Sequence, residues 1–503
     1  MHQYTPSRQR GCAMLRQGGV PVAVLVRYGG RVMILFDNCR FLIATPDPEG
    51  IIEDGWVLVD GPVIHSVGGP EDSPKDEVVR QGGEIVDCSH RLVMAGLIDS
   101  HNHLANYAFN LLPGIDPSSL DFSGISECLE KFIWPAYTWA SDESTYDMTM
   151  LAMCNAIKHG TTTVTSAFPF PHGTFRAGVA SGMRLIIHPQ TVSNVILGDD
   201  LDDDGYLALT EEVIQDCHNA EDGRIQVAVH PHTTYSCSER LLLGCMELAE
   251  RYDVGFATHL LESVEDRDLS DAQFAAWGGI VGYLQDRGIL QERTLFFHCD
   301  QVNRDEAETF AEAGVAISHN PQSNATYHGS VADVPALRAA GVTLGLGTDM
   351  PAGNLFDNIY TAYLVNAIIP ADHEGQFEPW VPIELATIGS ARAQRLGDRV
   401  GTIEAGKRAD IITVNLHRNT TLYPLNAGNL LYWIVTKCAG TLVEDTMVDG
   451  RFLLRDGEFT FLDEEAIIAH SDEWMVRFES WYRARKAAGE PVTVRKYPDY
   501  EIR

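Results

Sequence analysis

The sequence predicts an α/β fold whose larger part is a (β/α)8, TIM-like barrel. From residue 93 onward, short apolar runs rich in β-branched residues alternate with longer segments whose apolar residues recur every three or four positions. The first pattern is typical of buried strands and the second of helices that pack over a sheet. Most of the short runs also end on a histidine or an aspartate, and the catalytic side chains of such barrels lie at the carboxyl ends of the strands.

Eight of the short runs are candidate barrel strands. The first, LVMAGLID, is a continuous apolar stretch that ends at Asp99. The eight runs cover residues 92–99, 161–167, 183–188, 225–230, 254–259, 294–299, 314–318 and 342–347. Helices are expected between them, among others over Ser238–Tyr252, Ala272–Arg287, Arg304–Ala313 and Val334–Ala340. Strands and helices that alternate in this way favour a parallel sheet.

Composition narrows the class of protein. No apolar run approaches the roughly 18 residues of a membrane span, and the first thirty residues lack the order of a secretory signal, so a cytoplasmic location is expected. The ten cysteines include no C-x-x-C pair, which is typical of reduced, packed thiols. A formal charge of −33 argues against nucleic acid and anionic membranes as partners, because both require a basic face.

The polar residues at the strand ends predict a metal site. In a barrel they would converge on one mouth, and imidazole and carboxylate together are the ligand set of a zinc-like divalent ion. His101 and His103 are two positions apart, which points both rings to the same side of an extended backbone. The residues that end the other runs, or lie just beyond them, are His230, His232, His259, His298, His319 and Asp349.

Each of these residues taken alone has an ordinary explanation. A single His-x-His pair occurs by chance in loops, His259 could be a hydrogen-bonded core histidine, and Asp349 could cap a helix. Their joint placement at predicted strand ends favours the metal site.

Five motifs in this region resemble those of the amidohydrolase superfamily. They are GLIDSHNHL, THLLES, FFHC, SHNPQSN and LGTD, and they have the order and spacing of that superfamily. More narrowly, the chain resembles the metal-dependent aminohydrolases and chlorohydrolases, the branch that includes S-adenosylhomocysteine deaminase, guanine deaminase and the triazine hydrolases. The resemblance covers residues 32 to 460, including the segment ATIGSARAQRLGDRVGTIEAGKRADIITVNL.

The resemblance implies a second, smaller β-sandwich domain built from both chain ends. Short strand patterns with turn residues between them, such as RVMILFDNCRFLIAT and ADIITVNL, agree with it. The expected division is an N-terminal extension over 1–30, the composite β-sandwich over 31–92 and 396–460, the barrel over 93–395, and a helical tail over 461–503. The resemblance also suggests a homodimer or larger homo-oligomer, and the tail is expected either to form its interface or to pack on its own barrel.

By resemblance, His101, His103, His259 and Asp349 hold one divalent ion, with zinc expected first and iron as the alternative. Such an ion lowers the pKa of a water that it binds. His298 matches the family histidine beside the metal. Glu262 completes the family's H-x-x-E, and a carboxyl at that position can pass a proton to a ring nitrogen; its ordinary alternative is a solvated loop carboxylate.

The expected function is hydrolysis that displaces ammonia or an amine from a nitrogen heterocycle, with Glu262, His298 and Asp349 as catalytic residues. The alternatives are the same chemistry on another leaving group, such as halide or the nitrogen of a cyclic amide, and a catalytically inactive scaffold. The binuclear branches need a lysine at the end of the fourth strand, which VAVHPHTTYSCS lacks. The residues expected to contact a small heterocyclic substrate are His232, Tyr327, His328 and Trp134.

Overall fold

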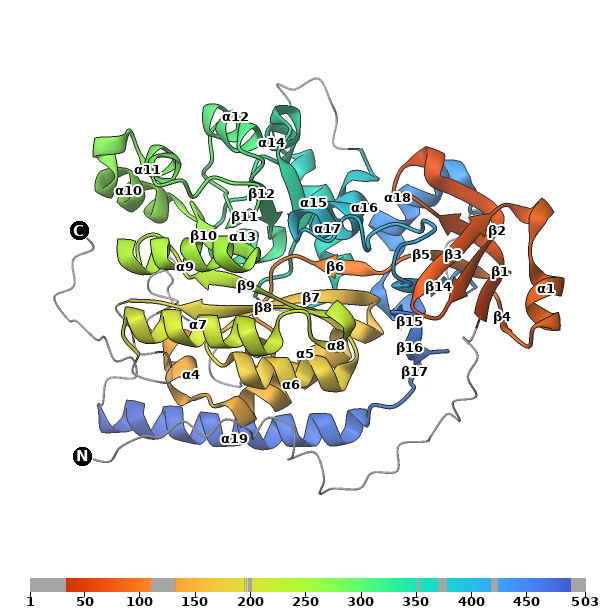
Figure 1. The fold of residues 1–503 in the computed structure, drawn as a ribbon, viewed down its shortest axis with the longest axis horizontal. Coiled ribbons are helices and arrows are strands. Elements are labelled where there is room, and N and C mark those ends of the chain that lie inside the picture. Colours follow the sequence, from red (N-terminus) through yellow and green to blue (C-terminus); the bar gives the residue numbers. More distant parts are fainter. Residues whose placement is uncertain are drawn as a thin grey trace.

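Two β-sheets organise the chain, as Figure 1 shows. The computed structural model describes residues 33–109, 129, 133–193, 195, 197, 201–350, 353–369, 378–417 and 424–489. The predicted N-terminal extension, residues 1–30, lies outside the described residues.

The larger sheet is a barrel of eight parallel strands that follow one another in sequence order. Its first and last strands approach each other, because the amide of Ser100 donates to the carbonyl oxygen of Leu346 at 3.0 Å and Asn102 bridges to Asp349. The predicted barrel is therefore confirmed. Its strands are β6 (Leu97–Asp99), β7 (Thr161–Phe168), β8 (Arg184–Thr191), β9 (Ile225–Pro231), β10 (Gly255–Leu260), β11 (Thr294–His298), β12 (Ala316–His319) and β13 (Thr343–Leu346).

Helices cover the outside of the barrel. A typical one is α9 (Glu239–Tyr252), where the Ser238 side chain accepts from the amide of Leu241 as an N-cap and the apolar residues face the strands. None of the helices within the described ranges is both long and apolar enough to cross a membrane. The other main covering helices are α5 (Asp142–Lys158), α6 (Pro171–Ser181), α7 (Asp203–Cys217), α12 (Arg304–Glu312), α14 (Val334–Ala340) and α15 (Leu355–Ala367).

One predicted helix is corrected by the structure. Instead of a single helix over Ala272–Arg287, the chain forms α10 (Val264–Gln273), a short 3-10 turn, and α11 (Ile280–Asp286). The break falls at Gly278 and Gly279, whose φ angles are 79° and 114°. Glycine adopts this left-handed region readily, and a regular right-handed helix cannot contain it.

The smaller sheet is mixed and combines both ends of the chain, as predicted. Strands from the two ends are neighbours, because β5 lies between β1 and β14. A bulge after Phe36 lets the first half of β1 pair with β4 and the second half with β5. The strands are β1 (Met33–Ile43), β2 (Ile51–Asp60), β3 (Val63–Gly68), β4 (Glu84–Asp87), β5 (Arg91–Ala95), β14 (Ile411–Asn415), β15 (Val443–Val448), β16 (Arg451–Arg455) and β17 (Glu458–Phe459).

The junction between the two sheets lies inside the run predicted as the first barrel strand. Residues 92–99 do not form one strand, because β5 ends at Ala95 in the smaller sheet and β6 begins at Leu97 in the barrel. Gly96 makes the passage possible, since a Cβ atom there would lie 2.2 Å from the side chain of Thr162. Its amide donates to the carbonyl oxygen of Asp410 at 3.0 Å.

A buried ion pair ties the barrel to the smaller sheet. The guanidinium of Arg184, at the start of β8, donates to both oxygens of Asp410 at 2.9 Å and also contacts Asp449. Arg184 is 1% exposed. A two-point contact of this kind fixes orientation as well as distance.

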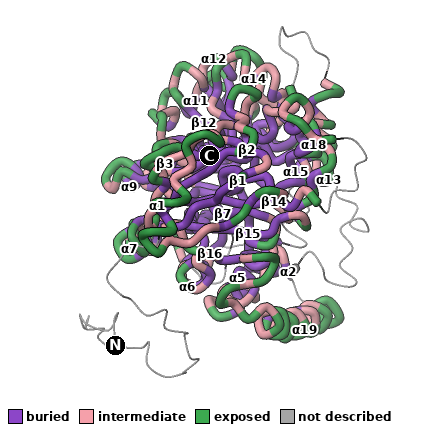
Figure 2. Tube along the Cα trace, turned by 90° about the vertical axis from the view of Figure 1, so that its right-hand side faces the viewer, coloured by how far each residue is buried: buried purple, intermediate pink, exposed green. Residues whose placement is uncertain are grey.

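The C-terminal tail forms the long helix α19 (Glu464–Ala488), which packs on its own barrel. Trp474 donates through Nε1 to Asp147 of α5 at 2.7 Å, and Ser471 donates to the Asp147 carbonyl oxygen at 3.0 Å. Figure 2 shows the rest of the helix surface as exposed or half-buried. Of the two predicted roles of the tail, packing on the barrel is the one observed within this chain.

Candidate active site

The four predicted metal ligands meet at the carboxyl ends of the barrel strands. His101 and His103 follow β6 directly, His259 lies in β10 and Asp349 follows β13. Their ligand atoms form two groups that share His101, one with His103 and Asp349 and the other with His259 and His298. Within each group all ligand atoms lie within 4.8 Å of one another, and all five residues are buried.

Hydrogen bonds fix which nitrogen carries the proton in two of these rings. Nδ1 of His103 lies 2.8 Å from the carbonyl oxygen of Ala167, and Nδ1 of His259 lies 2.9 Å from that of His232. A carbonyl oxygen only accepts, so each Nδ1 donates and each Nε2 keeps a free lone pair. Burial lowers the pKa of both imidazoles, and the two rings are neutral at pH 7.

His101 completes a donor set that fits a metal ion. Burial lowers its pKa to about 4, and its Nδ1 has no hydrogen-bond partner among the described residues. Its Nε2 lies 3.2 Å from Asp349 Oδ1, and Nε2 of His103 lies 3.5 Å from the same oxygen. Neutral nitrogens grouped around one carboxylate oxygen are the ligand set of zinc-like ions. The residues present therefore fit one divalent cation.

Asp349 is held in place from several directions. Its amide donates to the carbonyl oxygen of His101 at 2.9 Å, and the hydroxyl of Ser323 donates to its Oδ2. Burial by itself would raise the pKa of this carboxyl, but His101 and His298 hold it well below its usual range. Asp349 is therefore an ionised carboxylate whose Oδ1 faces the imidazoles.

A second buried carboxyl, Asp99, connects the first and last barrel strands next to the proposed ligands. It accepts hydrogen bonds from the Thr348 hydroxyl at 2.6 Å and from Asn102 Nδ2 at 2.9 Å. Burial raises its pKa to about 6. Thr348 precedes Asp349, and Asn102 lies between His101 and His103. The two hydrogen bonds to Asp99 therefore fix the ligands that follow the first barrel strand relative to the ligand that follows the last.

Glu262 lies beside the metal ligands, three residues after His259. Its Oε1 is 2.9 Å from Nε2 of His328 and 3.6 Å from Nε2 of His298. His298 is itself held by Asn324, whose Oδ1 lies 2.8 Å from Nδ1. Burial alone would raise the pKa of Glu262, but His298 and His328 lower it to about 2. The carboxyl is therefore ionised at pH 7 and not a solvated loop group, since it is 6% exposed.

A small pocket opens onto these groups. Its volume is about 40 Å³. Three of the predicted substrate contacts, His232, Tyr327 and His328, line it. Trp134 does not; it is buried in an apolar cluster with Ala105 and Phe168. The other lining residues are His103, Asn106, Leu129, Ile133, Tyr137, Gln190, His259, Glu262, Ser323, Asp349 and Met350.

The sequence analysis did not single out Gln190 and Asn106. Gln190 lies on β8 two positions beyond His188, so the alternation of that strand places both side chains on its inner face. Its Oε1 is buried and has no hydrogen-bond partner in the described residues. Nδ2 of Asn106 donates to the hydroxyl of Tyr137 at 3.1 Å. The side-chain amides of Gln190 and Asn106 therefore add hydrogen-bonding groups to a pocket for which the sequence analysis had named mainly histidines.

Comparison with known proteins identifies the family. The sequence profile described as the amidohydrolase family matches residues 92–453. The chain belongs to the amidohydrolase family. The predicted family and enzyme class are thereby confirmed: this amidohydrolase is a hydrolase of carbon–nitrogen bonds other than peptide bonds.

Relatives and solved structures cover most of this amidohydrolase. It is 31% identical over 440 residues to the 5'-deoxyadenosine deaminase of Methanothermobacter thermautotrophicus. The aligned region covers 86% of this chain and 97% of the relative. It is 30% identical over 429 residues to the 5-methylthioadenosine/S-adenosylhomocysteine deaminase 1 of Syntrophus aciditrophicus, with 83% and 91% covered. The crystal structure of an adenosine deaminase from Xanthomonas campestris with bound zinc has the same fold, with a TM-score of 0.78 at 24% identity over 90% of this chain and 99% of that one.

One histidine of the amidohydrolase barrel lies differently from the prediction that it joins the others at the mouth. Nε2 of His319 is 3.3 Å from Nδ2 of Asn366 on α15, so its side chain faces the covering helices, whereas the neighbouring Ser318 faces inward. His230 does face the interior, but its Nδ1 lies 3.1 Å from the carbonyl oxygen of Ala257, and it belongs to neither ligand group.

Proposed function

We propose that this amidohydrolase is a metal-dependent deaminase that releases ammonia from an adenine nucleoside. The observation that carries the proposal is the meeting of neutral imidazoles, the ionised Asp349 and the ionised Glu262 in one pocket. The adenine ring is proposed because relatives that are 31% and 30% identical are named as deaminases of 5'-deoxyadenosine and of 5-methylthioadenosine or S-adenosylhomocysteine.

His101, His103, His259 and Asp349 are the proposed ligands of one divalent ion, zinc first and iron as the alternative. When bound, such an ion lowers the pKa of a water molecule towards neutrality. The chain's own contribution is to present neutral Nε2 atoms, through the carbonyl contacts of His103 and His259, and to keep Asp349 ionised.

Glu262 is the proposed proton carrier. As an ionised carboxylate it accepts a proton from the attacking water and then donates it to the ring nitrogen next to the carbon under attack. Protonation makes that carbon more electrophilic, and positioned acid–base groups of this kind contribute typically 10²–10⁴-fold to a rate. Once the water oxygen has bonded to the carbon, the ionised carboxyl takes the second proton from that hydroxyl and gives it to the amino group. The carbon–nitrogen bond then breaks, the carbon keeps the oxygen as a carbonyl, and ammonia leaves as a neutral molecule.

His298 and His328 position this carboxyl. Both place Nε2 near Glu262 Oε1, at 3.6 and 2.9 Å. The hydrogen-bond contact with His328 and the nearby ring of His298 favour one orientation of the carboxyl, which leaves Oε2 to move the proton. His298 also belongs to one of the two ligand groups, so in this proposal it faces the attacking water.

Substrate orientation is proposed to come from His232, Tyr327 and Gln190. His232 is oriented by a 2.9 Å contact between its Nδ1 and the Ser236 hydroxyl. The buried Oε1 of Gln190 lacks a partner within the described residues, and an exocyclic or ring N–H of a bound heterocycle would satisfy it. Replacing one of the three should alter the ranking of substrates with metal content unchanged, because such groups act by differential contact.

The test is a substrate screen on the zinc-loaded and iron-loaded protein. The panel contains adenosine, 5'-deoxyadenosine, 5-methylthioadenosine, S-adenosylhomocysteine, guanine, a pterin amine and a chlorotriazine, with ammonia and chloride measured in parallel. Ammonia release from an adenine nucleoside, with replacement of its amino group by hydroxyl, is the expected result. Turnover of the chlorotriazine alone would overturn the deaminase proposal and favour the alternative leaving group. No turnover of any compound by protein with full metal content would favour the inactive scaffold.

A further inference from the structure

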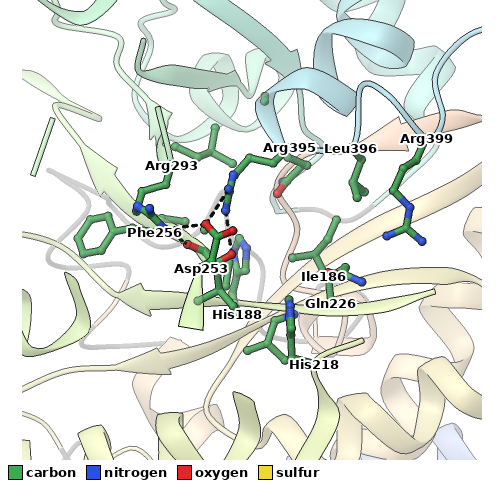
Figure 3. A pocket seen from close by; sticks show the side chains of 18 residues that line it. Ile186, His188, His218, Gln226, Asp253, Phe256, Arg293, Arg395, Leu396 and Arg399 are labelled. Atoms are coloured by element: carbon green, nitrogen blue, oxygen red, sulfur yellow. Dashed lines mark hydrogen bonds and ion pairs between the residues drawn. The ribbon is translucent and has the colours of Figure 1, made fainter. Parts of the chain in front are cut away.

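A second cavity lies at the opposite end of the barrel from the candidate active site, and Figure 3 shows it from close by. We call it the basal cavity. Its volume is about 210 Å³. The amino-terminal parts of β8 to β11 line one side. The other side is lined by the end of α17 (Ser390–Ala393) and by the residues just after it, Gln394, Arg395, Leu396 and Arg399. With roughly 30 Å³ per water molecule, it has room for a small ligand and some of its water.

The rim of the basal cavity carries more positive than negative charge. Arg293, Arg395 and Arg399 line it, and Asp253 is the carboxylate among its lining residues. Asp253 Oδ1 is shared, since it lies 2.9 Å from Nη2 of Arg395 and 3.3 Å from Nη1 of Arg293. One carboxylate therefore pairs with two guanidinium groups, and a third guanidinium lines the same cavity, in a protein whose formal net charge is −33.

Arg399 forms no ion pair in the described part of the chain, although Asp449 and Asp410 are near enough to act on its charge. Its Nη2 donates to the carbonyl oxygen of Gly223 at 3.0 Å, and no described carboxylate lies within ion-pair distance of it. In Figure 3 dashed lines join Asp253 to Arg293 and Arg395, whereas Arg399 reaches the cavity from another direction. A guanidinium has five N–H donors in a fixed fork, so most of its donors are left for other partners.

An unpartnered buried side chain reaches the inner end of the same cavity. His188, on the inner face of β8, is among the lining residues and is fully buried. Neither of its ring nitrogens has a hydrogen-bond partner among the described residues. A neutral imidazole always carries one N–H, and buried donors are almost always paired, which points to an occupant of the cavity as the missing partner.

From these observations we infer that the basal cavity is a binding site for a small oxyanion, a phosphate or a carboxylate. Arg399 would supply a forked contact to two oxygens, a geometry that suits both groups. Arg293 and Arg395 would supply the remaining positive charge, with Asp253 orienting them. The His188 side, reached directly or through one water, would close the inner end. The site is separate from the proposed deaminase chemistry and does not depend on it.

Titration of the metal-loaded, full-length protein with inorganic phosphate, and separately with malonate, tests the inference by calorimetry. Binding of at least one anion is expected, with affinity that falls as salt rises. Binding of phosphate alone assigns a phosphate group, and binding of malonate alone assigns a carboxylate. Arg399→Met should weaken binding at least about tenfold, because a charge-assisted forked contact is lost. Arg477→Met is the matched control, since Arg477 lies on α19 and does not line the cavity.

Two further variants locate the binding event. His103→Ala, at the other end of the barrel, should bind the anion as the unchanged protein does; loss of binding in this variant would place the anion at the metal site and overturn the inference. Arg395→Gly offers a second test if Arg399→Met does not fold, because Arg395 has a φ of 58° that glycine adopts without strain. Equal affinity in Arg395→Gly and Arg477→Met, or no binding of either anion, would also overturn it.

Discussion

Exchange of Glu262 for glutamine separates proton transfer from metal binding. Glutamine keeps the shape of the side chain and can still meet His328 and His298, but it cannot carry the proton. Turnover should fall by about 10²–10⁴-fold, which corresponds to about 3–5 kcal/mol at 1.36 kcal/mol for each factor of ten. Metal content should stay normal, because Glu262 belongs to neither group of ligand atoms.

The same exchange should also cost stability. The pKa of Glu262 is lowered from 4.5 to about 2, so its neighbours favour the ionised form by an amount of order 3 kcal/mol in this buried site. A carboxyl whose folded pKa is depressed stabilises the fold above pH 4.5 and loses that contribution as pH falls towards 2. The variant should therefore unfold at lower denaturant at pH 7, with the difference shrinking in acid.

The assay is ammonia release by protein of measured metal content. His328→Gln is the matched comparison, because it removes one partner of the carboxyl and leaves the carboxyl itself; it should lower turnover less. If the glutamine variant, fully metal-loaded, kept more than a tenth of the turnover, Glu262 would not carry the proton. Loss of metal in that variant would make Glu262 a ligand.

Three further predictions follow from buried groups. His259→Ala should sharply lower metal content measured by mass spectrometry, because one of four proposed ligands is lost, whereas His319→Ala should leave it unchanged; equal content in both would refute the ligand assignment. Burial lowers the pKa of His188 to about 3, so below pH 6.5 the unfolded chain binds a proton that the folded chain does not, and the free energy of unfolding falls by about 1 kcal/mol from pH 7 to 5.5; urea unfolding of His188→Gln should lack that part of the decline. Arg184→Met should destabilise by about 3–5 kcal/mol, because Asp410 is left buried without its partner, and an unchanged unfolding midpoint would contradict this.

The barrel and the cluster of polar residues at its mouth could be predicted because the ends of buried strands can be recognised from the sequence alone. Buried strands are short apolar runs, and a polar residue at the end of each run marks the mouth. His101, His103, His259 and Asp349 all stand at such ends, and Glu262 follows His259 at a fixed spacing. Their meeting in space needs only the parallel order of the strands.

What the sequence did not reveal depends on which sheet, or which face of a strand, a residue occupies. The residues next to Gly96 are apolar on both sides, Met94 and Ala95 before it and Leu97 and Ile98 after it, so composition gives no sign that the chain changes sheets there. His319 ends its run but faces outward, while His188 faces inward from the middle of a strand that continues through Pro189 to Thr191. Applying the two-residue alternation of strands to each histidine would have separated these cases. The amino acids around Trp134 give no such alternation, and its packing partners come from distant segments.

The place of β5 in the smaller sheet determines when, during synthesis, the proposed metal site can form. One neighbour of β5 is β1, made early in synthesis, and the other is β14, residues Ile411–Asn415. The strand just before β6, which leads into His101 and His103, thus gains its second hydrogen-bonded edge only after nearly the whole barrel has been synthesised. Contacts between such distant segments form slowly because a long loop must close first. On the ribosome, the first two proposed ligands are therefore made long before they can be held in place, and the proposed metal site is completed only late in the folding of this enzyme.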